Sequence, residues 1–374
     1  MTSTTWWRKL DHLQPLLAGM LAALGLMTVF SARADWGRQV LWVILGVGAY
    51  AAVSSFDYRR WRSLAVGLYA GMILTLLAVH LVGHSALGAR RWLSVAGFPL
   101  EPSELSKLLL VVVLAAYLSR SDRPSRQISW RTFGGALLLV APPACLVLTQ
   151  PDLGTTIVFI GVLFGMLFLA GASAWQLFSI VFAGGVALPL LPYLLHGYQR
   201  RRLEVFLDPN QDPLGAGYNL LQARIAVGSG GMFGQGWLHG LQGQLGFVPE
   251  RATDFVFAIF AEEFGLLGSL VLLALFGTLL IRLLRTAAVS PDRFGELLAG
   301  GVSVMILVQV VENVGMNIGV LPIAGIPLPL ISYGGSATIA VLAALGLVQS
   351  VAMRRRAVDE PVAELGTITR RAQA

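Results

Sequence analysis

Apolar segments long enough to cross a membrane recur along almost the whole chain, and this feature limits the fold more than any other. About 20 predominantly apolar residues in a helix span the hydrocarbon core of a bilayer. Ten such segments can be read: 13–31, 38–55, 64–83, 103–119, 133–149, 155–171, 174–195, 253–281, 295–319 and 334–353. The sequence therefore predicts an all-α polytopic membrane protein with about ten transmembrane helices, formed by residues 1–374 as one integral membrane domain.

The composition agrees with this prediction and excludes several classes of function. Hydrophobic residues make up 56% of the chain and charged residues 13%, with a mean hydropathy of +0.71. A large soluble domain, a disordered chain and a nucleic-acid binder are excluded on these figures. The histidines lack metal-site spacing, Cys145 is the single cysteine, and neither a Walker A motif nor a complete GxGxxG occurs. We therefore expect no nucleotide chemistry.

The distribution of basic residues predicts the orientation in the membrane. If the N-terminus is cytoplasmic, most of the 27 Lys and Arg residues fall on cytoplasmic segments, as the positive-inside rule requires. Both termini, including the tail 354–374, are then cytoplasmic. The segment 196–252 becomes one large extracellular loop. The first apolar run follows Arg8 and Lys9, but it is longer than the core of a signal peptide, and we expect an uncleaved helix.

Ionisable residues at the ends of apolar segments need an explanation, because charge is costly inside a membrane. Glu104 and Lys107 are three residues apart near the start of the fourth segment and can pair on one helix face. Two interpretations stay open for them. They form a structural ion pair, or the pair holds an anionic ligand and orients another carboxylate.

Asp254 follows Pro249-Glu-Arg-Ala-Thr253 and begins a strongly apolar segment. A Thr-Asp sequence at this place is typical of a helix N-cap, and capping alone would explain it. The alternative is catalysis, since partial desolvation at the outer membrane boundary makes a carboxylate a stronger base. Glu262 lies about 12 Å further along a helix and cannot form a close acid–base pair with Asp254. A lone carboxylate fits transfer from a pyrophosphate donor, whose leaving group cations can stabilise without a general acid.

Other polar residues are candidates for substrate contacts or for helix packing. Further ionisable residues on the predicted outer side are Arg90, Arg91, Asp152, Arg224 and Glu250, and deeper ones are Glu262, Glu263 and Glu312. Glu312, Asn313 and Asn317 form a polar face that we interpret as helix–helix hydrogen bonding. The Gly161-xxx-Gly165 and Gly315-xxx-Gly319 motifs, like Gly67-xxx-Gly71, indicate close packing of helices.

Several motifs, in this order along the chain, resemble those of the SEDS family (shape, elongation, division, sporulation), and most closely its RodA branch. They are Gly88-Ala-Arg-Arg-Trp92, Glu101-Pro-Ser-Glu-Leu-Ser-Lys107, Gln150-Pro-Asp-Leu-Gly154, Phe206-Leu-Asp-Pro-Asn-Gln-Asp-Pro-Leu-Gly-Ala-Gly-Tyr-Asn219, Gly230-Gly-Met-Phe-Gly-Gln-Gly-Trp237, Pro249-Glu-Arg-Ala-Thr-Asp-Phe-Val-Phe257 with Glu262-Glu-Phe-Gly265, and Gly315-Met-Asn-Ile-Gly319 with Ser332-Tyr-Gly-Gly335. The resemblance implies an inverting peptidoglycan glycosyltransferase that polymerises lipid II during cell elongation. It also implies a multi-pass protein of the bacterial cytoplasmic membrane with its active site facing outward.

The resemblance further implies roles for residues and partners. Asp254 would be the general base, and Lys107, positioned by Glu104, would face the leaving pyrophosphate with Arg224 and with Arg90 or Arg91. Asp152 and Glu250 would contact substrate. A divalent metal ion, Mg²⁺ or Mn²⁺, is expected, and no organic cofactor. The expected partners are lipid II, a class B penicillin-binding protein of the penicillin-binding protein 2 type, and other membrane proteins of the elongation machinery.

The chain departs from the family pattern at three positions, and two rival functions stay open. Ala252 replaces a His that usually precedes Thr-Asp, Glu101 replaces a usual Gln, and Ala337 replaces Ser or Thr. Any mechanism in which that His is essential is therefore in doubt. The first rival function is a flippase or transporter of lipid II or other lipid-linked sugars, which needs a polar route through the midplane. The second is a non-catalytic scaffold that recruits the transpeptidase.

Overall fold

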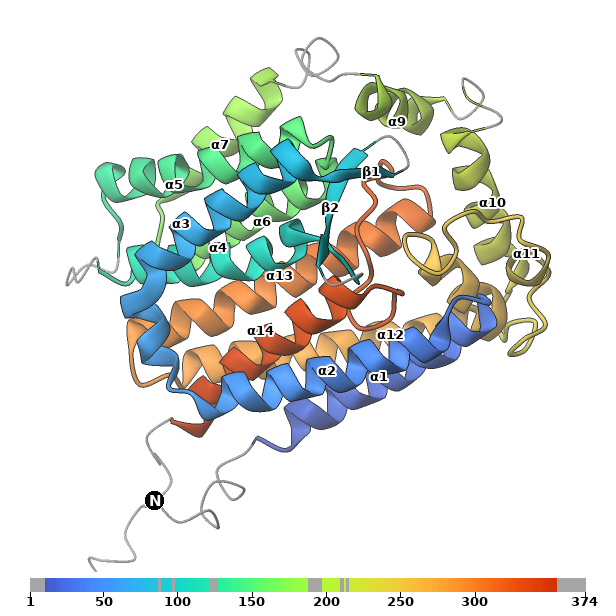
Figure 1. Ribbon diagram of the computed structural model, residues 1–374, viewed down its shortest axis with the longest axis horizontal. Helices are drawn as coiled ribbons and strands as arrows, with labels where there is room; N and C mark the ends of the chain where they lie inside the picture. The colour runs from blue at the N-terminus through green and yellow to red at the C-terminus, as the bar shows by residue number, and fades with distance from the viewer. Residues whose placement is uncertain are drawn as a thin grey trace, which may run out of the picture.

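The computed structural model describes residues 11–86, 89–95, 98–120, 127–187, 197–208, 212 and 215–354. Ten of its helices coincide with the predicted apolar segments: α1 (Leu13–Ser31), α2 (Trp36–Ser55), α3 (Tyr58–Val82), α4 (Pro102–Leu118), α5 (Trp130–Thr149), α6 (Leu153–Leu169), α7 (Ala174–Ala187), α12 (Val256–Ala288), α13 (Arg293–Asn317) and α14 (Gly335–Met353). These helices form one bundle (Figure 1). The end of the seventh predicted segment, 188–195, and the tail 355–374 lie outside the described residues.

Length and composition confirm a polytopic membrane protein. Seven of the described helices are long and apolar enough to cross a membrane, and α6 and α7 are shorter apolar helices. The remaining helix, α4, has 17 residues and carries the buried Glu104 and Lys107. The count of ten spans therefore stays a prediction.

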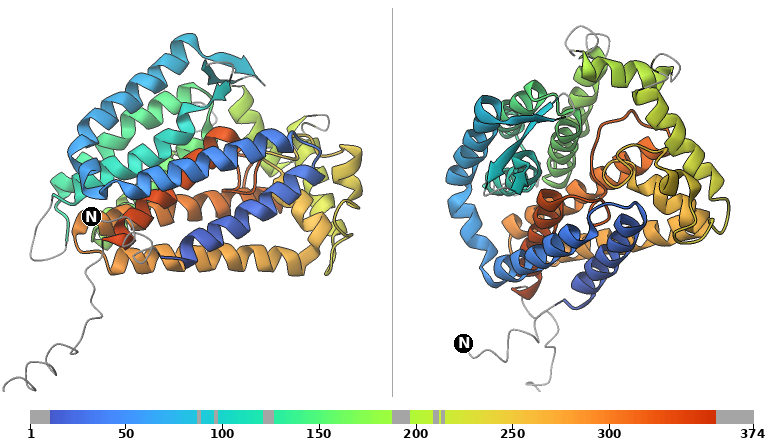
Figure 2. Two further views of the ribbon diagram at one scale, coloured as in Figure 1. Left: turned by 60° about the horizontal axis from the view of Figure 1, so that its bottom comes forward. Right: turned by 45° about the vertical axis from the view of Figure 1, so that its right-hand side comes forward.

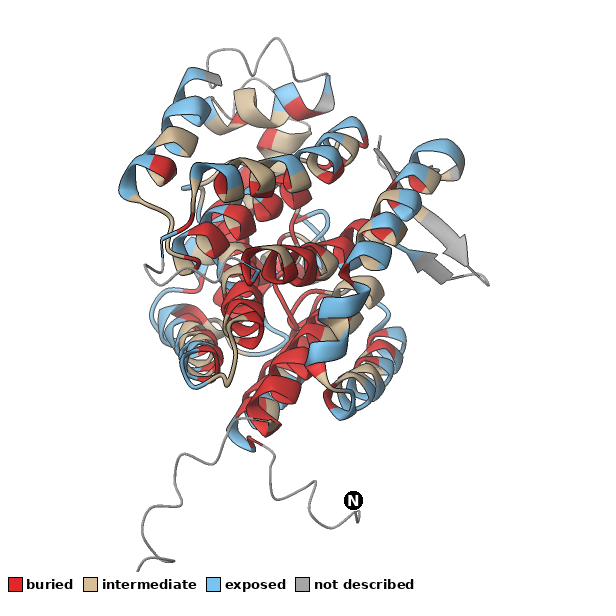
Figure 3. Cartoon of the chain, turned by 90° about the vertical axis from the view of Figure 1, so that its left-hand side faces the viewer, coloured by how far each residue is buried: buried red, intermediate tan, exposed pale blue. Residues whose placement is uncertain are grey.

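Burial separates the central helices from those that face lipid. In their most apolar windows, α13 is 72% buried and α14 78%, whereas α2 and α3 are each 22% buried (Figure 3). The predicted close packing occurs at one motif, since side chains added at Gly161 and Gly165 would collide with Val308 and Val304 of α13. The helix that carries Glu312, Asn313 and Asn317 is thus in the middle of the bundle.

A small antiparallel sheet connects α3 to α4, where the sequence predicts no strand. Its strands are β1 (His84–Ala86), β2 (Ala89–Val95) and β3 (Phe98–Leu100), in the order β1-β2-β3. In the register, Ser85 is opposite Arg90 and Ser94 is opposite Pro99. The sheet borders the cleft described below.

The segment predicted as a large loop, 196–252, contains three helices: α9 (Tyr198–Leu207), α10 (Ala216–Ser229) and α11 (Leu241–Leu245). Figure 2 shows these helices, coloured green to yellow, arranged around one end of the bundle beside the start of α12. The segment is therefore built onto the bundle, with Leu220, Ala223 and Ala226 fully buried.

Helix α12 is interrupted at Gly265, and the loop after α10 completes its hydrogen bonds. Gly265 has a φ of 67° and a ψ of −165°, a conformation that strains any residue with a side chain. Amides of the loop donate to the last carbonyls before the break, and amides after the break donate to loop carbonyls: Gln235 N to Glu262 O (2.9 Å), Gly236 N to Glu263 O (3.0 Å), Leu266 N to Gly231 O (2.9 Å) and Leu267 N to Met232 O (3.1 Å). The interruption thus leaves these backbone groups satisfied.

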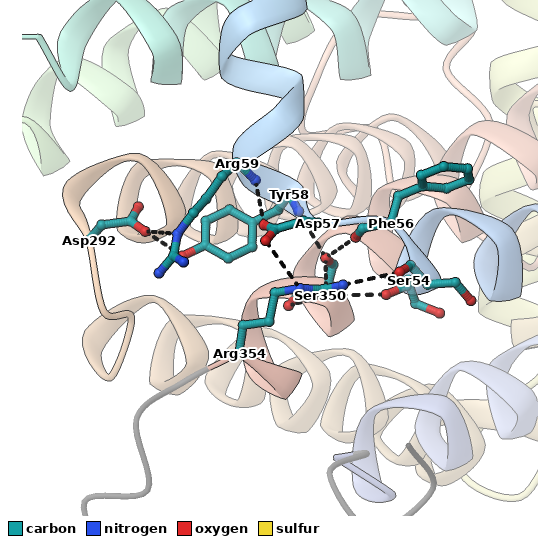
Figure 4. Close-up of polar contacts among 9 residues, drawn as sticks. Ser54, Phe56, Asp57, Tyr58, Arg59, Asp292, Ser350 and Arg354 are labelled. Atoms are coloured by element: carbon teal, nitrogen blue, oxygen red, sulfur yellow. Dashed lines mark hydrogen bonds and ion pairs between the residues drawn. The ribbon is translucent and has the colours of Figure 1, made fainter. Parts of the chain in front are cut away.

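At the opposite end of the bundle, polar contacts join the start of α3 to α13 and α14 (Figure 4). The carboxylate of Asp292 accepts from Tyr58 Oη (2.5 Å), Arg59 Nε (3.0 Å) and the amide of Gly295 (2.9 Å). Burial acts to raise the pKa of Asp292, but these three hydrogen bonds outweigh it and hold that pKa below its usual value. The amide of Tyr58 also donates to Ser350 Oγ (3.1 Å).

Candidate functional site

An open cleft of about 560 Å³ lies where the first turns of six helices converge. The lining includes one residue from the start of each: Arg38 of α2, Glu104 of α4, Thr155 of α6, Asn219 of α10, Phe255 before α12 and Ser336 of α14. Trp92 of β2 and Arg202 of α9 close other sides of the cleft, and the segment between α13 and α14 contributes its floor.

This convergence gives the cleft an electrostatic preference. The N-terminus of a helix carries partial positive charge and unpaired amides, so it favours anions. Two of these termini are partly neutralised, because Asp35 caps α2 and Asp152 caps α6 by accepting from Thr155 N (3.1 Å). In α4, α10, α12 and α14 the N-cap residue makes no side-chain cap hydrogen bond, although Asp212 accepts from the first amide of α10 (3.0 Å) and Asn317 accepts from Ala258 N in the first turn of α12 (3.1 Å). The arrangement suits a ligand with a compact, multiply charged anionic group.

Asp254 lines the cleft just before α12, and the capping interpretation is wrong. The N-cap position of α12 is Phe255, and the helix begins at Val256. Asp254 thus lies one residue before the N-cap position. A turn that starts at Glu250 precedes Asp254, and the φ of Glu250, 51°, is unusual for a residue other than glycine. Glu250 lines the cleft and accepts from Thr253 Oγ1 (3.1 Å).

Glu104 and Lys107 form the predicted ion pair on α4. Lys107 Nζ lies 2.7 Å from Glu104 Oε1, and the two side chains are 2% and 5% exposed. Both residues line the cleft. The second oxygen of Glu104 has no hydrogen-bond partner among the described residues. The pair thus brings a desolvated cation to the cleft wall without a net buried charge.

Arg202 is a cleft residue that sequence reasoning did not single out. A methyl group added at Gly325 would lie 3.0 Å from Arg202 Nη1 and 3.1 Å from Asp254 Oδ2, so both side chains meet at this glycine. Arg202 Nη1 also donates to the carbonyl of Ile323 (3.4 Å). The run of three arginines at 200–202 was the available signal, but it does not show which of them turns inward.

The other predicted residues divide between the cleft and its surroundings. Asp152 lines the cleft and is 2% exposed. Arg224 is not among the described lining residues, because its guanidinium donates to the carbonyl of Gly319 (2.8 Å) instead. Arg90 and Arg91 lie in β2, next to Trp92 in the cleft wall, but their side chains are outside the described part of the chain.

The deeper carboxylates Glu262 and Glu263 hold the loop and do not enter the described lining of the cleft. Glu262 accepts from the amides of Gln242 (2.8 Å) and Gly243 (3.1 Å). Glu263 accepts from the amide of Leu238 (3.1 Å) and from Ser31 Oγ. These contacts fix the loop to the first part of α12.

Comparison with known proteins decides the family. The family model described as a cell cycle protein, FtsW/RodA/SpoVE, matches residues 12–357. The chain belongs to the FtsW/RodA/SpoVE family. Among curated relatives of this family, peptidoglycan glycosyltransferase MrdB of Escherichia coli is 41% identical over 371 residues, which cover 96% of this chain and 98% of MrdB. The resemblance inferred from the motifs is thus confirmed.

Solved structures of the FtsW/RodA/SpoVE family share the fold. The rod shape determining protein RodA of Thermus thermophilus is 32% identical, with a TM-score of 0.70, and the match covers 92% of this chain and 97% of that one. A structure described as showing the coordination of polymerization and crosslinking by a peptidoglycan synthase complex is 34% identical with a TM-score of 0.80, over 92% and 97% of the two chains. The match therefore extends across the bundle and the cleft.

Proposed function

We propose that this chain polymerises lipid II into glycan strands, with Asp254 as the general base of an inverting transfer. The class of activity, peptidoglycan glycosyl transfer in elongation, follows from the family and from relatives such as MrdB that carry this name. The observation that carries the proposal is the position of Asp254. It lies in a cleft where helix N-termini and cationic side chains favour an anion.

The chemistry follows from this arrangement. Asp254 takes the proton from the 4-hydroxyl of the acceptor sugar GlcNAc, and that oxygen bonds to the anomeric carbon of the donor sugar MurNAc. The bond from this carbon to the lipid pyrophosphate breaks on the opposite face, so the configuration inverts. The pyrophosphate leaves as a stable anion and needs positive charge near it more than it needs a proton.

Lys107 and Arg202 are the cations that we assign to the leaving pyrophosphate. Both line the cleft with Asp254, whereas Arg224 lies apart. Glu104 would hold Lys107 in place, and Asp152 and Glu250 would contact the sugars or their amides. Arg90 and Arg91 remain candidates because β2 borders the cleft.

A divalent ion, Mg²⁺ or Mn²⁺, remains part of the proposal as a companion of the pyrophosphate. The described residues contain no group of three or more His, Cys, Asp or Glu side chains that could hold a metal. Such an ion would therefore take most of its ligands from phosphate oxygens and water, as Mg²⁺ commonly does, with one or two cleft carboxylates at most. When bound, it would neutralise charge on the pyrophosphate.

The orientation and the partner are proposals of the same kind. We place both termini in the cytoplasm and the cleft on the outer face of the bacterial cytoplasmic membrane, since basic residues such as Arg59, Arg293 and Arg354 gather at the end opposite the cleft. The proposed partner is a class B penicillin-binding protein that cross-links the strands, together with other membrane proteins of the elongation machinery. The match to a synthase complex that couples polymerization and crosslinking supports this choice.

The test is a polymerisation assay with purified protein in liposomes that contain lipid II, with and without Mg²⁺ and the transpeptidase. Wild type should make glycan, and Asp254→Asn should make none while it keeps its thermal stability and its binding of lipid II. Turnover by Asp254→Asn would remove this carboxylate from the mechanism. Movement of lipid II across the bilayer without glycan synthesis would support the flippase instead.

A further inference from the structure

The backbone that carries Asp254 is held by an unusual set of hydrogen bonds from distant parts of the chain. Three successive carbonyls, those of residues 252–254, each accept from a donor outside α12. The contacts are Tyr333 N to Ala252 O (2.7 Å), Ser332 Oγ to Thr253 O (2.6 Å), and Asn313 Nδ2 (2.9 Å) and Asn317 Nδ2 (3.1 Å) to Asp254 O. We call the side chains of Asn313, Asn317 and Ser332 the carbonyl clamp.

Asn317 replaces the hydrogen bond that would extend the helix. In a helix that included Asp254, its carbonyl would accept from the amide of Ala258. Here the carboxamide of Asn317 lies between these two groups: its Nδ2 donates to Asp254 O, and its Oδ1 accepts from Ala258 N (3.1 Å). The side chain satisfies both backbone groups and lets α12 begin only at Val256. Asp254 therefore stays outside the helix.

The clamp residues are themselves fixed and fully enclosed. Asn313 and Asn317 are 0% exposed, and Ser332 is 3% exposed. Asn313 Nδ2 also donates to Ile326 O (2.7 Å), and Ser332 Oγ accepts from Leu328 N (2.8 Å). Buried polar groups of this kind are costly unless every partner is in place, so the set specifies one geometry.

We propose that Asn317, with Asn313 and Ser332, is a positioning residue that holds Asp254 out of α12 and directs its carboxylate into the cleft. This inference rests on the proposed role of Asp254 as the base. The described hydrogen bonds of the clamp all go to backbone groups or to other clamp residues, and those beside Asp254 go to the carbonyls of Thr253 and Asp254, so the clamp acts through Asp254 and not on the substrate. Helix packing alone, which the sequence favoured for these asparagines, would not require three consecutive carbonyls to be held.

Removal of the clamp should let α12 gain a turn. In Asn317→Leu, the carbonyl of Asp254 keeps only the bond from Asn313, and the amide of Ala258 keeps only its bond to Phe255 O (3.1 Å), so a direct bond between the two groups would replace what each has lost. Each residue that joins a helix turns by about 100° relative to the next. The carboxylate of Asp254 would then leave its position in the cleft, and a misplacement of 1 Å at a catalytic group can cost about 10²-fold in rate.

The experiment measures kcat and KM for lipid II polymerisation in liposomes, together with hydrogen exchange of residues 252–258. Asn317→Leu should lower kcat about 10²-fold, leave KM unchanged, and change the exchange of the 252–258 amides. Ser332→Ala should lower kcat less, and Ser332→Thr, which keeps the hydroxyl, should restore it. Gln309→Leu is the matched control, because Gln309 is an equally buried amide on α13 with no described hydrogen bond to residues 252–254.

The outcomes separate this inference from the proposed function. If Asp254→Asn is inactive but Asn317→Leu and Ser332→Ala polymerise at the wild-type rate, the clamp is not a positioning device. If Asn317→Leu and Gln309→Leu lose activity equally, with the same loss of stability, the role is structural only and the inference is overturned. If Asn317→Leu does not fold, the test rests on the two Ser332 variants. Equal kcat values for Ser332→Ala and Ser332→Thr would then overturn the inference. Activity in Asp254→Asn would instead overturn the proposed function.

Discussion

Replacement of Lys107 by Met tests whether the buried ion pair serves catalysis as well as stability. The side chains of Lys107 and Glu104 are 2% and 5% exposed, so the magnitudes for buried pairs apply, not the 0–1 kcal/mol of surface pairs. Removal of one partner leaves the other charge uncompensated and costs about 3–5 kcal/mol. Removal of both charges together often changes the free energy of unfolding little. Lys107→Met should therefore be strongly destabilised, and Glu104→Gln/Lys107→Met should regain most of the stability.

Activity should not follow stability in this series. We expect the double variant to unfold near the wild-type temperature but to polymerise lipid II poorly, because it lacks the cation that we assign to the leaving pyrophosphate. The assay is thermal unfolding in detergent beside glycan synthesis in liposomes for the wild type, both single variants and the double variant. A double variant that recovers glycan synthesis along with stability would refute the catalytic role of Lys107. A stable single variant would refute the buried pair itself.

Three further results are expected. Gly265→Ala should destabilise the protein by about 1–3 kcal/mol, since its φ is 67° and its Cβ would approach Gly234 N at 2.3 Å; unchanged thermal unfolding would contradict the break in α12. Arg224→Ala should keep kcat and KM for lipid II near wild type, because its guanidinium contacts Gly319 outside the cleft; a large rise in KM would return it to the substrate. The lowered pKa of Asp292 means that its stabilisation is complete above its unfolded pKa and is lost as pH falls through the folded value, below about pH 4. Asp292→Asn should therefore lose less thermal stability than the wild type as the pH falls below about 4. The same dependence of thermal stability on pH in both proteins would count against this role of Asp292.

The positions of the helices could be predicted because the bilayer imposes them. Each of the ten predicted segments coincides with a described helix, usually within a few residues at its ends. The pairing of Glu104 with Lys107 was also predictable, since both residues lie on one helix and their spacing fixes their distance. Sequence spacing was sufficient to predict contacts between residues that are close together in the sequence.

Contacts between distant segments could not be predicted in this way. The Thr-Asp at 253–254 has the composition of an N-cap, but α12 begins only at Val256. The amide of Ala258 in its first turn is held by Asn317, more than 60 residues later, with a carboxamide that no local pattern reveals. Arg202 and Asp254 meet at Gly325 only because α9 folds back over the segment after α13. The same limit explains why the sequence does not single out Arg202.

The interruption of α12 has a mechanical consequence. Because the chain of hydrogen bonds stops at Gly265 and continues through the loop, the piece between Val256 and Phe264 is attached to residues 230–243 at one end and to Asp254 at the other. A displacement of the loop would thus reach the backbone of Asp254 through a helical piece of about two and a half turns. The amides of Leu266 and Leu267, after the break, also donate to this loop, so the loop couples the two pieces of α12 to each other.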